Sequence, residues 1–136
     1  MMFKEFIPLQ LERLGQDSQL IPGTVEVLAG FKQRKIVTGS TTDYTQAMVE
    51  INLKEARKQG YNPDCTVASD EVPAGRPLPF ACWKNAIELQ TWPIEACVKI
   101  GDTIPGICEG LMDARTIYGV FGKTSWRRDS DRFRQQ

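Results

Sequence analysis

Short apolar runs alternate with helical stretches from residue 35 onward, and this alternation constrains the fold more than any other feature of the sequence. The apolar runs are IVTG (36–39), CTVA (65–68), VKIG (98–101) and TIYGV (116–120), and the helical stretches span residues 45–58, 79–89 and 105–112. Strands that alternate with crossover helices form parallel sheets with helices on both faces. The sequence therefore predicts an α/β fold.

The first 33 residues predict two further helices separated by a turn. Apolar residues at spacings of three and four form the stripe of one helix over residues 3–14, which kinks or begins at Pro8. The segment LIPG (20–23) is a stiff turn, and Thr24 is a candidate N-cap for a second helix over residues 25–33. This turn is the one candidate domain boundary in the chain.

The composition excludes several classes of function. Seventeen Lys and Arg balance seventeen Asp and Glu, so no net charge favours nucleic acid or a membrane surface. The sequence has no leader pattern and no apolar run of spanning length, so we expect a cytoplasmic protein. With no histidine, the chain lacks a Ser-His-Asp or Cys-His set, and we expect its four dispersed cysteines to be buried, reduced thiols: Cys65, Cys82, Cys97 and Cys108.

Three loops follow the predicted strands, at the edge where parallel α/β sheets bind ligands. The first, GSTTDYT (39–45), brings hydroxyls and backbone amides to a helix N-terminus and suits a phosphate group, although Ser and Thr also cap helices. The second, VPAGRPLP (72–79), is rigid and presents Arg76, whose guanidinium binds phosphate oxygens or forms a surface salt bridge. The third, KIGDT (99–103), ends in Asp102, a candidate magnesium ligand or helix N-cap.

The amino-acid sequences of these loops resemble those of one protein family. GSTTDYT is similar to GSTTGYT, EVPAGRPLPFACWKNAIEL is similar to DVPAGRP followed by an aromatic-rich helix with a KNA step, and IGDTIPGICEGL is similar to a VGDT or DDT loop followed by PGIEEGL. These motifs are those of the phosphonoacetaldehyde hydrolases, or phosphonatases, which are haloacid-dehalogenase-like hydrolases. FIPLQLERL and SQLIPG also resemble the final cap helix and return linker of that family, and the likeness runs from about residue 3 to residue 120.

The resemblance implies a Rossmann-like parallel sheet of the haloacid-dehalogenase-like core, incomplete here, with one remnant cap helix at the N-terminus. Residues 1–20 would be the remnant of the helical cap and its return linker, and residues 21–120 would be a partial core. Residues 121–136 form a polar tail with four arginines, which we expect to be disordered, the alternative being an anion-binding arm.

The resemblance also implies a reaction and a set of roles. In the family, a cap Lys forms a Schiff base with the aldehyde of phosphonoacetaldehyde, and a core Asp bound to magnesium attacks phosphorus. The products are acetaldehyde and phosphate, a step of phosphonate degradation. Matched residue by residue, Thr42 would hydrogen-bond the phosphoryl group, Arg76 would pair with it, and Asp102 would bind Mg²⁺. The ligand would be phosphonoacetaldehyde or a phosphate-like small molecule.

The sequence departs from the family at the covalent catalysts. No stretch resembles the nucleophile strand, which reads roughly DWAGTT, and Lys4, Lys84 and Lys99 do not match the Schiff-base position. Asp43 replaces a Gly of the phosphate loop and puts a negative charge beside the expected anion site. We therefore expect a truncated member of the family that is inactive on its own. The alternatives are a non-catalytic phosphate- or magnesium-binding module, or a generic haloacid-dehalogenase-like phosphatase fragment.

The expected sheet is open at its centre. In the family, the nucleophile strand lies between the two strands that correspond here to residues 36–39 and 98–101. In its absence we expect a gap of about two strand spacings, roughly 9 to 10 Å, rather than direct pairing of these strands. The unpaired edges would make the chain marginally stable and prone to form a homodimer or to self-associate in another way.

Overall fold

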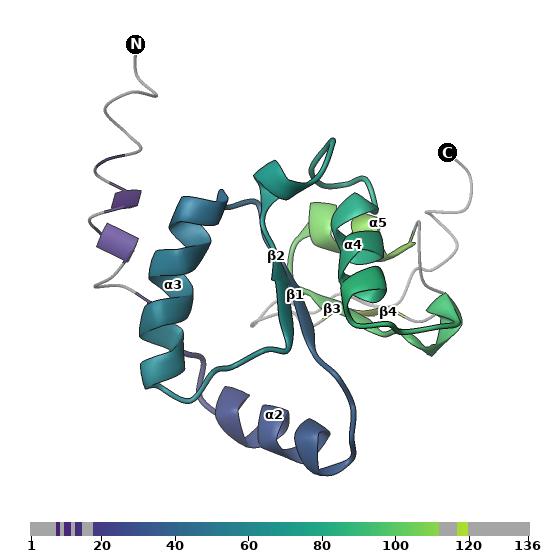
Figure 1. The fold of residues 1–136 in the computed structure, drawn as a ribbon, viewed down its shortest axis with the longest axis horizontal. Helices are drawn as coiled ribbons and strands as arrows, with labels where there is room; N and C mark the ends of the chain where they lie inside the picture. The colour runs from purple at the N-terminus through teal and green to yellow at the C-terminus, as the bar shows by residue number, and fades with distance from the viewer. Residues whose placement is uncertain (1–7, 9, 12, 15–17, 112–116, 120–136) are drawn as a thin grey trace.

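Helices and strands alternate along the chain as the sequence predicts (Figure 1). The structure is a computed structural model that describes residues 8, 10–11, 13–14, 18–111 and 117–119. Its helices are α2 (Thr24–Gln33), α3 (Gln46–Lys58), α4 (Phe80–Glu88) and α5 (Ile104–Leu111), and its strands are β1 (Gly39–Thr41), β2 (Cys65–Val67), β3 (Lys99–Gly101) and β4 (Ile117–Gly119). Two single 3₁₀ turns, η1 (Ser69–Glu71) and η2 (Ile94–Ala96), lie between them.

The strands form two parallel pairs. In the first pair Gly39, Ser40 and Thr41 lie opposite Cys65, Thr66 and Val67. The second pair joins β3 to β4. Within the described residues no backbone ladder connects β1 to β3, which confirms the prediction that these two strands do not pair directly.

Helices cover both sides of the β1–β2 pair, as buried parallel strands require. Figure 1 shows α3 on one side of this pair and α4 on the other. The amphipathic helix α3 buries Met48, Val49 and Ala56, and α4 buries Ala81. Together with Val67 of β2, which is 1% exposed, these side chains form a small core around the first strand pair.

The strand β1 begins three residues later than predicted. The Ile36 amide donates a hydrogen bond of 3.0 Å to the Phe31 carbonyl at the end of α2. The backbone amide and the hydroxyl of Thr38 donate hydrogen bonds to the Asp64 carboxylate at 2.8 and 3.1 Å. The hydrogen bond from the backbone amide is the main reason that the pKa of Asp64 is lowered. These contacts make residues 36–38 a connection, and the ladder with β2 begins only at Gly39.

The prediction that Thr24 caps the second helix is wrong. Thr24 is the first residue of α2, and its hydroxyl donates to the Ile21 carbonyl at 2.7 Å. Gly23 holds the N-cap position with a φ of 89°, a left-handed conformation that glycine adopts without steric cost. The LIPG turn therefore supplies the start of the helix through its glycine.

Parts of the predicted N-terminal helix and the whole predicted tail lie outside the described residues. The described residues between 8 and 14 are helical, in agreement with a helix that contains Pro8. The proposed roles of residues 1–20 and 121–136 remain predictions.

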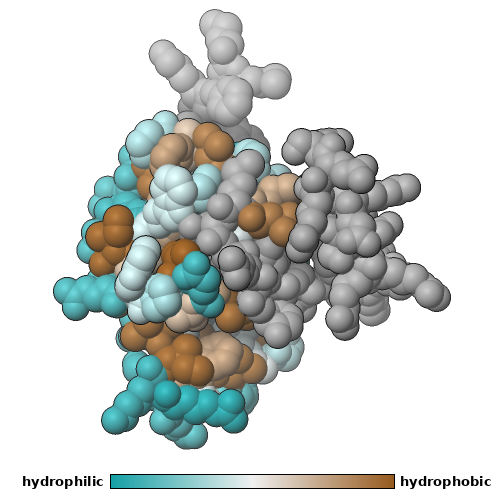
Figure 2. All heavy atoms as spheres, turned by 90° about the vertical axis from the view of Figure 1, so that its right-hand side faces the viewer, coloured by the Kyte–Doolittle hydropathy of each residue, from teal (hydrophilic) through white to brown (hydrophobic). Residues whose placement is uncertain are grey.

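Several apolar side chains beside the unpaired strand edges are exposed. Ile36, Val37, Val98 and Ile100 are between 47% and 54% exposed, although the sequence pattern is that of buried strands. Figure 2, which views the right-hand side of Figure 1, shows apolar surface in several places among the described residues of that face. Of these four residues Ile100 lies within β3, Val98 directly precedes it, and Ile36 and Val37 lie in the connection before β1.

The cysteines are less buried than predicted. None of the four forms a disulfide, and each is half-buried. Burial, followed by the charge of Glu88, raises the pKa of the Cys65 thiol.

None of the helices among the described residues has the length and apolar character needed to span a bilayer.

Candidate functional site

Consecutive side chains at the carboxyl end of β1 lie on opposite sides of the strand. Because side chains alternate along a strand, Thr41 shares one side with Gly39, and Thr42 shares the other with Ser40. A Cβ on Gly39 would lie 2.6 Å from the side-chain oxygen of Asn85 in α4, so the side of Gly39 and Thr41 faces α4. Thr41 and Thr42 therefore have different surroundings.

Arg76 lies against the end of β1 on the side of Thr41. Its Nη2 donates to the Thr41 carbonyl at 2.6 Å and to the Thr41 hydroxyl at 2.9 Å. Its Nε donates to Oε2 of Glu109 in α5 at 3.1 Å. The side chain is only 19% exposed, so the rigid VPAGRPLP loop holds the guanidinium at the sheet edge rather than in open solvent.

A buried carboxylate joins Arg76 to a second cation. Glu109 is fully buried, and its Oε2 also accepts hydrogen bonds from Lys99 Nζ at 2.8 Å and from the Thr41 hydroxyl at 3.2 Å. Lys99 donates to the Thr41 hydroxyl as well, at 2.6 Å. We call Thr41, Arg76, Lys99 and Glu109 the ionic cluster. It bridges the two strand pairs, because Thr41 belongs to β1 and Lys99 to β3.

The ionic cluster has a surplus of positive charge. Two cations share one buried carboxylate, whose second oxygen, Oε1, has no hydrogen-bond partner among the described residues. A further acid, Asp43, lies at the rim with its Oδ2 3.5 Å from Arg76 Nη1, and its side chain is 63% exposed. An exposed pair of this kind stabilises by on the order of 1 kcal/mol or less. With Asp43 counted, two carboxylates face the two cations, so an oxyanion at the outer edge would bind Arg76 Nη1 in competition with Asp43.

Thr42 lines a cavity of about 450 Å³ on the other side of β1, together with Ser40, Thr66 and Asn52 of α3. The Thr42 hydroxyl accepts a hydrogen bond of 3.2 Å from the Tyr44 amide, and within the described part of the chain its own hydrogen has no acceptor. Within the described residues no hydrogen bond joins Thr42 to Arg76. The structure thus places the two residues predicted to bind a phosphoryl group at the same strand end, without a hydrogen bond between them.

Asp102 is exposed directly after β3. The residue that caps α5 is Thr103, whose hydroxyl accepts a hydrogen bond of 3.3 Å from the Gly106 amide, so capping does not occupy the Asp102 carboxylate. In the described part of the chain no three His, Cys, Asp or Glu side chains converge to hold a metal. One exposed carboxylate still fits Mg²⁺ in the mode in which water and a phosphate group complete the coordination.

Thr41, Lys99 and Glu109 belong to the site but were not predicted from the sequence. Lys99 begins an otherwise apolar strand, and Glu109 lies in the largely apolar helix IPGICEGL. A charge in such a position indicates a buried ion pair, and this signal could have identified both residues. Their partner Thr41 could not be inferred in this way, because it depends on how β3 and α5 pack against β1.

The chain is similar to curated proteins that are named phosphonoacetaldehyde hydrolase, whereas no family model matches its sequence. The chain is 42% identical over 120 residues to a phosphonoacetaldehyde hydrolase of Syntrophobacter fumaroxidans and 46% identical over 119 residues to one of Bacillus cereus. Each alignment covers 88% of this chain but only 43% and 45% of the two relatives. The chain therefore spans less than half the length of these proteins.

Solved structures share the fold. A phosphonoacetaldehyde hydrolase-like protein from Oleispira antarctica superposes with a TM-score of 0.80 at 38% identity, over 88% of this chain and 42% of that one. A Thermotoga maritima protein assigned as a β-phosphoglucomutase superposes with a TM-score of 0.70 at 23% identity, over 82% of this chain and 52% of that one, which bears on the fold alone. The predicted architecture, a parallel sheet and helices of the haloacid-dehalogenase-like type, is confirmed.

Proposed function

We propose, from the premise that 88% of this chain is homologous to the phosphonoacetaldehyde hydrolases, that it provides the phosphoryl-binding part of such an enzyme. The substrate class is phosphonoacetaldehyde or a related small phosphonate or phosphate. The corresponding reaction is hydrolysis of the C–P bond to acetaldehyde and phosphate in phosphonate breakdown.

The observation that carries this proposal is the orientation of Arg76. Three of its five N–H donors are satisfied inside the protein by Thr41 and Glu109, which fixes the plane of the guanidinium. The two hydrogens on Nη1 have, among the described residues, only the weak contact with Asp43. A guanidinium held in this way loses little conformational entropy when it binds an oxyanion.

The family resemblance implies roles for two further residues at the carboxyl ends of β1 and β3. Thr42 would donate its free hydroxyl hydrogen to a phosphoryl oxygen, and Asp102 would hold Mg²⁺, which neutralises phosphoryl charge when bound. Asp102 would contribute the one protein carboxylate of that site, with water and the ligand completing the coordination.

The 136 residues on their own should bind the phosphoryl group without cleaving phosphonoacetaldehyde. The sequence contains no DWAGTT-like nucleophile stretch. Among the described lysines, Lys99 is held by Glu109 and Thr41, and Lys84 lies near Glu71 and Glu88 at 4.0 and 3.3 Å. Neither of these two lysines matches the Schiff-base position of the family.

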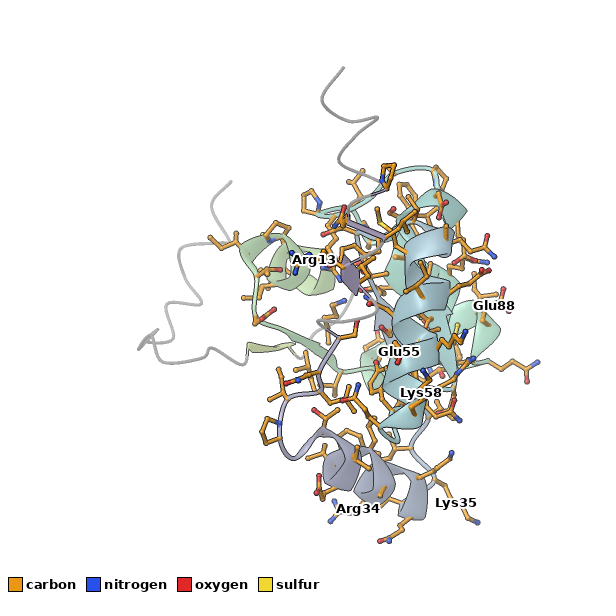
Figure 3. The ribbon with its side chains drawn as sticks, turned by 90° about the vertical axis from the view of Figure 1, so that its left-hand side faces the viewer. Arg13, Arg34, Lys35, Glu55, Lys58 and Glu88 are labelled. Atoms are coloured by element: carbon orange, nitrogen blue, oxygen red, sulfur yellow. The ribbon has the colours of Figure 1, made fainter. Side chains whose placement is uncertain are left out.

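The test of binding is a calorimetric titration of phosphate into the wild type, Arg76→Ala and Arg34→Ala. Arg34 is an exposed arginine at the end of α2 (Figure 3) and serves as a matched control for loss of one guanidinium. Loss of a charge-assisted contact costs about 1.5 to 3 kcal/mol, so Arg76→Ala should weaken binding by about tenfold to 150-fold. Equal affinity in all three proteins would move the site away from Arg76.

The test of catalysis is release of acetaldehyde from phosphonoacetaldehyde, together with borohydride trapping of a lysine adduct. We expect neither with the purified chain. Turnover with a trapped adduct would show that these residues contain a complete enzyme, whereas binding without turnover is the result expected for a phosphoryl-binding part.

A further inference from the structure

The position of Asp43 relative to Arg76 indicates how the site selects among oxyanions. Asp43 follows Thr42 in the GSTTDYT loop, and its carboxylate lies 3.5 Å from Nη1, the outward nitrogen of the guanidinium. The other nitrogens, Nε and Nη2, point into the protein toward Glu109 and Thr41. An oxyanion that binds the guanidinium from outside must therefore approach the nitrogen that Asp43 already contacts.

On its other side Nη1 lies close to α5, because a Cβ placed on the buried Gly106 would be 3.9 Å from it. The exposed side of Nη1 is therefore the side of Asp43. The Asp43 side chain is 63% exposed, against 19% for Arg76, so the carboxylate can swing into solvent while the guanidinium stays in place. Asp43 can thus be displaced by a ligand without rearranging the core.

We infer that Asp43 is a specificity-determining residue of this site, which competes for Arg76 Nη1 and disfavours doubly charged oxyanions relative to singly charged ones. This inference rests on the proposed phosphoryl-binding function of Arg76. The ligand must replace the Asp43 contact and then remain close to a displaced carboxylate. Coulomb repulsion from that carboxylate is twice as large for a dianion as for a monoanion at the same distance.

The experiment measures the affinities of sulfate, a dianion, and nitrate, a monoanion, for the purified chain by NMR titration of the arginine side-chain signals. These ions keep their charges over the working pH range, so ligand titration does not enter the comparison. The variants are Asp43→Asn, Arg76→Ala, and Glu88→Gln as the matched control. Glu88 is an exposed carboxylate in an ion pair with Lys84 on α4, and Figure 3 shows it on the outer surface.

In Asp43→Asn, sulfate should bind about threefold to fivefold more tightly. The ligand then replaces no ion pair at Arg76, and no displaced carboxylate repels it. Nitrate should gain less than sulfate, and Glu88→Gln should change neither. Arg76→Ala should remove sulfate binding both when it is introduced alone and when it is combined with Asp43→Asn. If Asp43 only orders the loop, Asp43→Asn should instead weaken the binding of sulfate and of nitrate equally.

The outcomes separate this inference from the proposed function. If sulfate binding depends on Arg76 but Asp43→Asn leaves the sulfate-to-nitrate ratio unchanged, the inference about Asp43 is wrong and the proposed function stands. If no Arg76-dependent binding occurs in either the wild type or Asp43→Asn, both are wrong.

Discussion

Lys99 of β3 donates a hydrogen bond of 2.6 Å to the Thr41 hydroxyl of β1, and this contact links the two strand pairs where, among the described residues, no backbone ladder does. Both residues also contact Oε2 of the fully buried Glu109. Charged side chains therefore perform, at the centre of this sheet, part of the connecting role that backbone hydrogen bonds usually have. The stability of the chain should depend on them.

Replacement of Lys99 by methionine should destabilise the fold by about 1.5 to 3 kcal/mol, because Glu109 loses a charge-assisted hydrogen bond in a buried position. Urea unfolding measures the change. The control is Lys58→Met, which removes a cation from the exposed pair with Glu55 on α3 (Figure 3) and should cost about 0.5 kcal/mol or less. Equal midpoints for the two variants would show that the ionic cluster is not a stabilising link.

Replacement of Gly39 by alanine should destabilise by about 1 to 3 kcal/mol through overpacking. The new Cβ would lie 2.6 Å from Asn85 Oδ1 and 3.1 Å from a methyl carbon of Leu89, so α4 would have to move away from β1. The comparison is Gly30→Ala within α2. Apart from the neighbouring backbone of α2, no atom of the described residues lies within 4 Å of the added Cβ, and helix propensity should stabilise by about 0.5 to 1 kcal/mol. Thermal unfolding of both variants should shift in opposite directions, and shifts of the same sign contradict this account.

The pair of Asp64 with Thr38 should make stability depend on pH in the acidic range. The hydrogen bond from the Thr38 backbone amide lowers the pKa of Asp64 below its ordinary value of 3.8. The stabilisation is therefore complete above that ordinary value and is lost as the pH falls through the lowered pKa. The advantage of the wild type over Asp64→Asn should be less than about 1 kcal/mol, because the carboxylate is exposed, and should shrink as the pH falls. Denaturant midpoints from neutral to strongly acidic pH measure it, and a difference that does not change with pH rejects the assignment.

The open strand edges should promote self-association that depends on protein concentration. Ile100, on β3 beside the unpaired edge, is 53% exposed. A lysine on an edge strand opposes pairing with another chain, so Ile100→Lys should reduce the associated fraction in sedimentation velocity. Ile87→Lys, at a 74% exposed position on α4, removes similar apolar surface without touching an edge and should change little. A wild type that stays monomeric at all concentrations would contradict the prediction.

The helices were predictable because their signals are local. The bounds predicted for α3 and α4 agree with the structure to within a residue, since periodic apolar positions are contained within each segment. The position of β1 was not predictable, although Ile36 and Val37 are typical strand residues. Its ladder starts where the partner strand starts, and Asp64 takes the Thr38 amide just before that point.

The site was predictable where one loop defines it and not where packing does. The VPAGRPLP loop singled out Arg76, which lies against the end of β1, and Asp43 of the preceding loop lies 3.5 Å from it. The phosphoryl-binding role of Arg76 stays a prediction. The ionic cluster combines residues 41, 76, 99 and 109, and no spacing in the sequence indicates that these four meet. Their meeting depends on the position of α5 and β3 relative to β1.

The alternation of side chains at the end of β1 makes two identical neighbours inequivalent. The Thr41 hydroxyl is saturated by Arg76, Lys99 and Glu109, whereas the Thr42 hydroxyl, beside a cavity, donates to no acceptor among the residues that the structure describes. A deletion or insertion of one residue in this strand would exchange their roles, because it turns every following side chain to the other face. The threonine doublet is therefore not redundant. Each position has its own tolerance to substitution, and a sequence alignment that shifts the doublet by one residue confuses a structural hydroxyl with an available one.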